Sequence, residues 1–313
     1  MSPSTIPFLF HLAPLPPSEI PAHPSIPYPI PPSTNGETTD SRPPLPIFLH
    51  AALTQAREFI TTTIPDKSFT VNPKLRDSPP SSAQVQVLTG TVKYTPLTSK
   101  GRAADSKEVK WFARRTIHDN RAVSGTASFE EFVHGLKDDH LLNEMEYEPN
   151  ITAVEDIAKW DCSAVEIEGG WSGLAASLSL VTHTFQPANL ISPRAFLALV
   201  ITAFTPSESP TSTQPCGFIN IQLPIHSSAV QSFSLPKGVI LAKYAAAEQV
   251  RILPDAGDSA GPGKLEWIMA TSSKAGGWIP EYLQNSGVSK AIVKDVGLFL
   301  KWVDEQRVKK MGK

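Results

Sequence analysis

From Trp171 onward the chain carries short runs in which apolar side chains dominate or alternate with polar ones, as they do in β-strands. Segments rich in proline, glycine and serine separate these runs and favour turns between antiparallel strands. No strand–helix–strand alternation occurs, which argues against a Rossmann-type fold. With two earlier runs included, the expected strands are Val85–Tyr94, Val109–His118, Trp171–Phe185, Phe196–Thr205, Gly217–Ile225, Val239–Ile252 and Lys264–Thr271.

Three segments show helical periodicity instead. In Ile47–Ile60 apolar side chains recur at helical spacing. Ser128 and Glu131 form a capping box, in which each side chain satisfies a free amide of the first helical turn. The chain closes on Ser289–Gln306, where an apolar stripe lies opposite lysines. The stripe starts one residue before this segment and consists of Val288, Ile292, Val296, Phe299, Leu300 and Val303.

The order of these elements indicates an α+β helix-grip fold. A helix is followed by two or three strands, a second helix, five strands and a long closing helix. We expect a curved antiparallel sheet that wraps around this C-terminal helix, with Ser289–Gln306 continuous across the concave face. The space between such a sheet and its helix is the natural ligand site.

Prolines set the N-terminal segment apart. Fourteen of the 30 prolines lie between Pro3 and Pro46, which excludes a helix or an inner strand there. Apolar residues among them, such as Phe8 and Phe10, are compatible with an arm that lies across the domain; a ligand for SH3-type modules is the alternative. We therefore expect a proline-rich arm (1–46), a helix with a linker (47–84) and a ligand-binding domain (85–308).

Composition narrows the class of protein further. The net charge of −2 offers no basic excess for nucleic acid binding. No run approaches the roughly 18 apolar residues of a membrane span, and the segment before Leu15 lacks the basic start of a signal peptide. We expect a cytoplasmic monomer in which Cys162 and Cys216 are reduced.

Known catalytic motifs are missing from the sequence. Gly170-Trp171-Ser172-Gly173 departs from the Gly-x-Ser-x-Gly nucleophile elbow. His134 and His140 are six residues apart, whereas two ligands on one helical face need a spacing of four. We expect no metal and no cofactor, and we find no sequence signal for an enzyme.

Three local segments resemble START lipid-transfer domains, in addition to the order of elements. They are Leu190-Ile191-Ser192-Pro193-Arg194-Ala195-Phe196, Pro236-Lys237-Gly238-Val239-Ile240, and Leu265-Glu266-Trp267-Ile268-Met269 through Gly277-Trp278-Ile279-Pro280. The likeness implies a START-like fold, also called Bet v 1-like, that encloses a hydrophobic small molecule.

The chain is most similar to an uncharacterised, mainly fungal START-like family, over roughly residues 107 to 305. The matching segments are Trp111-Phe112-Ala113-Arg114-Arg115, Ser128-Phe129-Glu130-Glu131-Phe132, Met269-Ala270-Thr271 and Lys294-Asp295-Val296. Sterol-binding START domains often place an acidic residue and an arginine in the pocket. Those places fall on Val181 and Val200 here, so the resemblance does not extend to that type of sterol site.

Segment matching to the START domains, combined with strand alternation, gives a set of expected ligand-binding residues. They are Val181, His183, Val200, Thr202, Phe218, Asn220, Gln222 and Tyr244 on the sheet, with Asp295 and Phe299 on the closing helix. Alternation alone leaves a second arrangement open, in which Asn220 and Gln222 face solvent and Ile219, Ile221 and Leu223 form the core. Asp295 could meet a ligand head group or a buried arginine, or lie in solvent.

The resemblance implies binding, and possible transfer, of a lipid, sterol or polyketide-like molecule, with transient membrane contact. Pro224–Lys237 and Gly276–Gln284 would form the gate through which the ligand enters. The alternative is a cyclase or hydratase that folds a polyketide-like chain in the same cavity, with His183, Tyr244 and Asp295 as the first catalytic candidates.

Overall fold

The computed structural model describes residues 6–28, 40–65, 68–95, 105–185, 191–206, 215–254, 263–277 and 281–311, the last range by backbone alone up to residue 286. Its helices are α1 (Leu45–Glu58), α2 (Phe129–Phe132), α3 (His140–Tyr147) and α4 (Glu281–Met311). Its strands are β1 (Phe69–Val71), β2 (Gln86–Tyr94), β3 (Lys107–Asp119), β4 (Ile151–Trp160), β5 (Ser172–His183), β6 (Arg194–Phe204), β7 (Gly217–Pro224), β8 (Ile240–Leu253) and β9 (Lys264–Lys274).

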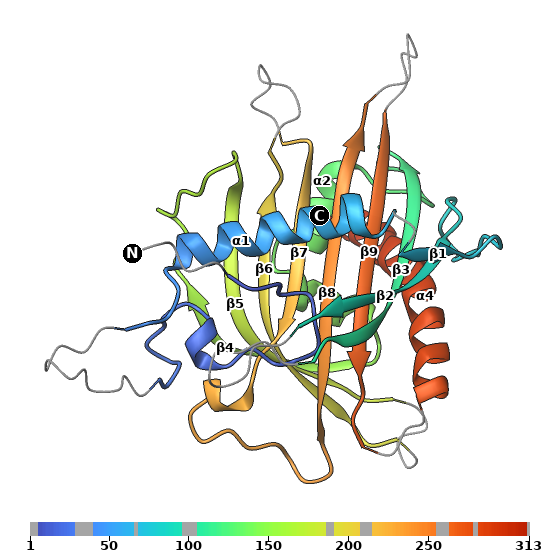
Figure 1. Ribbon diagram of the computed structural model, residues 1–313. Helices are drawn as coiled ribbons and strands as arrows, with labels where there is room; N and C mark the ends of the chain where they lie inside the picture. The colour runs from blue at the N-terminus through green and yellow to red at the C-terminus, as the bar shows by residue number, and fades with distance from the viewer. Residues whose placement is uncertain are drawn as a thin grey trace, which may run out of the picture.

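Within the described residues these strands form one sheet in the order β1-β2-β3-β9-β8-β7-β6-β5-β4. Each strand is antiparallel to its neighbours in that order. Beyond the end of β7, β6 also pairs with β8 in parallel, where Arg194 lies opposite Ile240. In Figure 1, α1 crosses one face of this sheet and α4 lies against the other. We call these the outer and the inner face.

Helix α1 covers the outer face because one side of it is apolar. Phe48, Leu49 and Leu53 are fully buried in one cluster with outward residues of β7 such as Ile221. Burial of large aliphatic and aromatic side chains is the main stabilising term of such a contact. The predicted helix Ile47–Ile60 is confirmed, with its start two residues earlier; a π-helical segment, Phe59–Thr63, extends it.

The N-terminal arm packs beside α1 on the same face. Within its described residues before α1, regular structure is limited to a short 3-10 helix at Pro17–Glu19. Phe10 is fully buried and stacks on Phe59 with ring centroids 5.3 Å apart. The main chain of Leu15 exchanges hydrogen bonds with Pro224 and His226, at 2.8 and 2.9 Å. The arm therefore contributes to the core on the outer face.

Helices α2, α3 and α4 cover the inner face. Phe299 of α4 stacks on Phe132 of α2 with centroids 5.1 Å apart, and its edge meets Trp267 of β9 at 5.2 Å. Ile292 and Val296 are buried in the same cluster. The prediction that Ser289–Gln306 is one continuous helix against the sheet is confirmed, because all of it lies within α4.

A second contact fixes α4 from its far side. The Ser78 hydroxyl donates to the Val293 carbonyl at 2.6 Å and accepts from the Gly297 amide at 2.9 Å. A Cβ atom at Gly297 would lie 2.3 Å from the Pro79 carbonyl oxygen, so only glycine permits this approach. The segment predicted as a linker thus holds α4 in place.

Two strands escaped the sequence analysis. β1 is three residues long and lies within the segment predicted as a linker. β4 forms the edge of the sheet, and its register shifts between Ile151 and Ala153 and again between Asp156 and Ala158. Each shift adds a residue that breaks the two-residue alternation, so β4 has no clean strand pattern. The predicted capping box at Ser128 is confirmed, with Glu131 as its partner.

Candidate functional site

A cavity of about 210 Å³ lies between the inner face of the sheet, α3 and α4. Side chains of β3 and of every strand from β5 to β9 line it, together with residues of the two helices. Because Asn220 lies opposite Glu248 and Gln222 opposite Ala246, strand pairing places these four side chains on one face. The aromatic part of the lining consists of Tyr147, Phe185, Phe196, Tyr244, Trp267 and Phe299.

Among the described residues that line the cavity, Arg114 of β3 is the one arginine, and it is 1% exposed. Its Nη2 donates to Glu248 Oε1 at 3.2 Å, and its guanidinium lies over the Trp267 ring, 3.8 Å from the centroid. Trp267 Nε1 donates to the same carboxylate oxygen at 2.7 Å. Nε and Nη1 of Arg114 have no hydrogen-bond partner among the described residues. The guanidinium therefore keeps free donors in the cavity wall.

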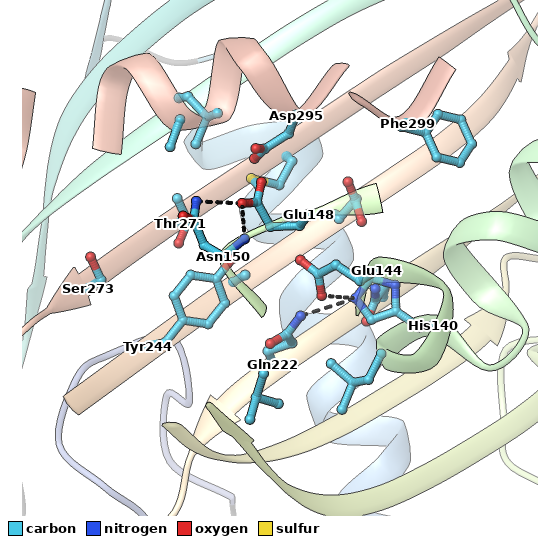
Figure 2. A pocket seen from close by; sticks show the side chains of 18 of the residues that line it. His140, Glu144, Glu148, Asn150, Gln222, Tyr244, Thr271, Ser273, Asp295 and Phe299 are labelled. Atoms are coloured by element: carbon cyan, nitrogen blue, oxygen red, sulfur yellow. Dashed lines mark hydrogen bonds and ion pairs between the residues drawn. The ribbon is translucent and has the colours of Figure 1, made fainter. Parts of the chain in front are cut away.

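Three further carboxyl groups line the cavity, from Glu144 on α3, Glu148 just after it and Asp295 on α4. Figure 2 shows them converging from the two helices on one space. Burial, reinforced by the charges of Asp295, Glu248 and Glu148, raises the pKa of Glu144 to about 8. Burial raises the pKa of Asp295 to about 7, although Arg114 opposes the shift. Both groups therefore titrate near neutral pH.

α3 supplies four lining residues that the sequence analysis did not expect in the site: His140, Leu141, Glu144 and Tyr147. Asp139 takes a left-handed conformation (φ 46°), which separates α3 from the preceding helical segment and turns His140 towards β7. His140 Nε2 lies 3.1 Å from Gln222 Nε2 and 3.4 Å from Glu144 Oε2. Since burial lowers the pKa of His140, we treat its imidazole as neutral.

The signal for α3 was present in the sequence. His140, Glu144, Tyr147 and Glu148 follow the spacing i, i+4, i+7 and i+8, which places them on one helical face. For this part of the chain the sequence analysis used only the capping box of Ser128 and Glu131, and it did not use this pattern. Glu248 could also have been predicted from the sequence, because strand alternation from Tyr244 places it on the same face of β8.

Seven of the ten expected ligand-binding residues line the cavity: Val181, His183, Asn220, Gln222, Tyr244, Asp295 and Phe299. His183 packs against Phe196 with centroids 5.0 Å apart, and burial lowers the pKa of its imidazole to about 4. Asn220 and Gln222 are buried on the inner face, while Ile219, Ile221 and Leu223 are buried on the outer face. Both faces of β7 are therefore covered, and neither amide lies in solvent.

Three expected residues lie elsewhere. Val200 and Thr202 share the inner face but line a separate hollow against β4, and His140 and Leu141 of α3 lie between the two spaces. Val200 packs with Leu141 and Val181. Phe218 is buried beside Phe129 of α2, with centroids 6.1 Å apart. Alternation predicted the face correctly in each case, but it cannot show which helix covers a given position.

The expected gate is only partly described. Within Pro224–Lys237 the chain forms a short 3-10 helix, Ser227–Ala229. Trp278, Ile279 and Pro280 of the expected approach to the closing helix lie outside the described residues, as does Leu190 of the START-like segment. No helix in the described ranges is long and apolar enough to span a membrane.

The family described as "Protein of unknown function (DUF3074)" matches residues 111–303, which run from β3 to α4. The chain belongs to this family. The matched range contains every residue named above as lining the cavity, from Arg114 to Phe299, so the cavity lies within the DUF3074 region. No curated protein sequence matches the chain.

Comparison with solved structures identifies the fold of this DUF3074 protein. Human STARD10 is 11% identical, with a TM-score of 0.53 over 84% of this chain and 82% of that chain. Human StAR-related lipid transfer protein 5 is 13% identical, with a TM-score of 0.48 over 82% and 98%. The likeness to STARD10 shows that this DUF3074 protein has the START-like helix-grip fold.

Proposed function

We propose that the protein binds one small, mostly apolar molecule in the cavity beneath α4, and that it carries such a molecule between sites. The observation that supports this proposal is the cavity itself: it is lined by aromatic and aliphatic side chains around a few converging polar groups. Pockets of this composition are the usual sites of small-molecule binding. The START-like fold is compatible with the proposal.

The size of the cavity limits the ligand. Its volume of about 210 Å³ lies below the roughly 300–1,000 Å³ typical of pockets for drug-sized molecules. A single alkyl chain or a compact ring system suits this space, whereas a phospholipid with two chains would require α4 to move. Burial of apolar ligand surface would supply most of the affinity.

A cavity-filling substitution tests the proposal. Ala246 on β8 lines the cavity and is buried, so Ala246→Leu should lower the affinity for the neutral apolar probe Nile red by about tenfold or more. Ala153→Leu makes the same change on the exposed surface of β4 and should leave binding unchanged. Equal affinities in all three proteins would contradict the proposal.

A catalytic role in the same cavity is the second candidate, and the carboxyl groups favour it. A general acid or base works best when its pKa lies near the working pH, and Glu144 and Asp295 meet this condition beside Tyr244. Mass spectrometry of the molecules that co-purify separates the two roles. An enzyme with Glu144→Gln and Asp295→Asn should retain an unreacted substrate that differs in mass from the parent's ligand, whereas a carrier should retain the parent's molecule, in full or in a reduced amount.

A further inference from the structure

The charges of the cavity lining are unbalanced. Four carboxyl groups face one guanidinium, and Arg114 is already paired with Glu248. The two imidazoles of the lining, His140 and His183, add no positive charge because burial disfavours their protonated forms. Among the described residues of the cavity wall, Glu144, Glu148 and Asp295 therefore have no cationic partner of their own.

An independent observation concerns Asn220, which is 2% exposed and also lines the cavity. Its Nδ2 donates to the Leu136 carbonyl at 3.4 Å, which directs the amide oxygen away from that carbonyl. The oxygen has no hydrogen-bond partner among the described residues. An amide oxygen can only accept, so this buried group calls for a ligand that donates.

We propose that the occupant is an apolar amine whose ammonium group lies among the carboxyl groups of Glu144, Glu148 and Asp295. This inference rests on the proposed function and specifies the ligand class of the same site. An ammonium group supplies N–H donors and the missing positive charge, and its attraction to carboxylates strengthens where water is excluded. The aromatic walls of the cavity also favour a cation.

The two free donors of Arg114 favour a different group, because they could donate hydrogen bonds to a carboxylate. The charge count decides against an acidic ligand, since its carboxylate would join the three that already lack a partner. A hydroxyl or carbonyl oxygen near the amine would use the Arg114 donors without adding negative charge. The alkyl chain of the amine fits the limited volume of the cavity.

Calorimetric titration of the full-length protein at pH 8 with decylamine, decanol and decanoic acid tests the inference. These probes share one chain length and differ in their polar end. We expect decylamine to bind about tenfold or more tightly than decanol, and decanoic acid to bind most weakly. Preference for decanol or decanoic acid would overturn the inference and leave the proposed function standing. If none of the three binds, the proposed function falls as well.

Charge-neutral variants provide a second readout. In the isosteric double variant Glu144→Gln with Asp295→Asn, decylamine and decanol should bind within about twofold of each other. Glu305→Gln removes a charge from the exposed part of α4 and should keep the parent's preference. If the double variant also keeps the full preference for decylamine, these carboxyl groups do not hold the ammonium, and the inference is wrong.

Discussion

On the outer face of the sheet, Ile219, Ile221 and Leu223 of β7 pack under α1 and the arm. On the inner face, Asn220 and Gln222 of the same strand are buried and border a cavity lined by four carboxyl groups. The outer side chains are fully accounted for by packing. Those of the inner face keep polar groups away from water, some without a hydrogen-bond partner among the described residues, which lowers stability. This difference within one strand supports the proposal that the inner face binds a ligand.

The largest expected effect comes from two substitutions at neighbouring positions of β7, a polar one on the outer face and an apolar one on the inner face. Ile221→Asn buries an amide without a partner under α1 and should cost about 3–5 kcal/mol of unfolding free energy. Asn220→Leu loses one long hydrogen bond to Leu136 and should change stability by less than about 1 kcal/mol. Urea denaturation measures both. Equal losses would show that the two faces are packed alike.

Substitutions in the N-terminal arm should have the next largest effect on the free energy of unfolding. Phe10 is fully buried against Phe59, so Phe10→Ala should cost about 3 kcal/mol. Phe8 is 36% exposed, and Phe8→Ala should cost less than about 1 kcal/mol. Thermal unfolding of the two variants compares them directly. If Phe10→Ala has the same Tm as the parent, the arm does not contribute to the core on the outer face.

The carboxyl groups of the inner face should make the stability of the protein depend on pH. The pKa of Glu144 is raised to about 8 in the folded state, against about 4.3 in an unfolded chain. Between these values the folded state binds more protons, so the free energy of unfolding falls as the pH rises. Glu144→Gln removes this fall and should raise Tm relative to the parent by about 2–4 °C more at pH 8 than at pH 5.

Glu305→Gln, on the exposed part of α4, is the matched control and should have the same Tm as the parent at both pH values. If Glu144→Gln shifts Tm equally at pH 5 and pH 8, its carboxyl group is not buried as described.

His118 and His183 affect the stability of the protein at low pH. Burial lowers the pKa of each to about 4, so both should reduce stability as the pH falls below about 6.5.

The sequence predicted the architecture well because the fold follows from periodicity. The apolar stripe of Ser289–Gln306 and the alternation in β7 and β8 are local patterns, and each element they indicate is present. The cavity was harder to predict, since it depends on which helix covers which strand. Val200 and Gln222 are register partners on one face, yet only Gln222 borders the cavity, because α3 lies between the two spaces.

The central claim is that the cavity under α4 holds one apolar molecule, and native mass spectrometry tests it most directly. After incubation with a mixture of single-chain amphiphiles, the 33.9 kDa parent should carry one bound molecule per chain. Ala153→Leu should carry the same molecule, and Ala246→Leu should carry none or far less. A parent that stays free of ligand, or an Ala246→Leu variant that binds as the parent does, would contradict the account.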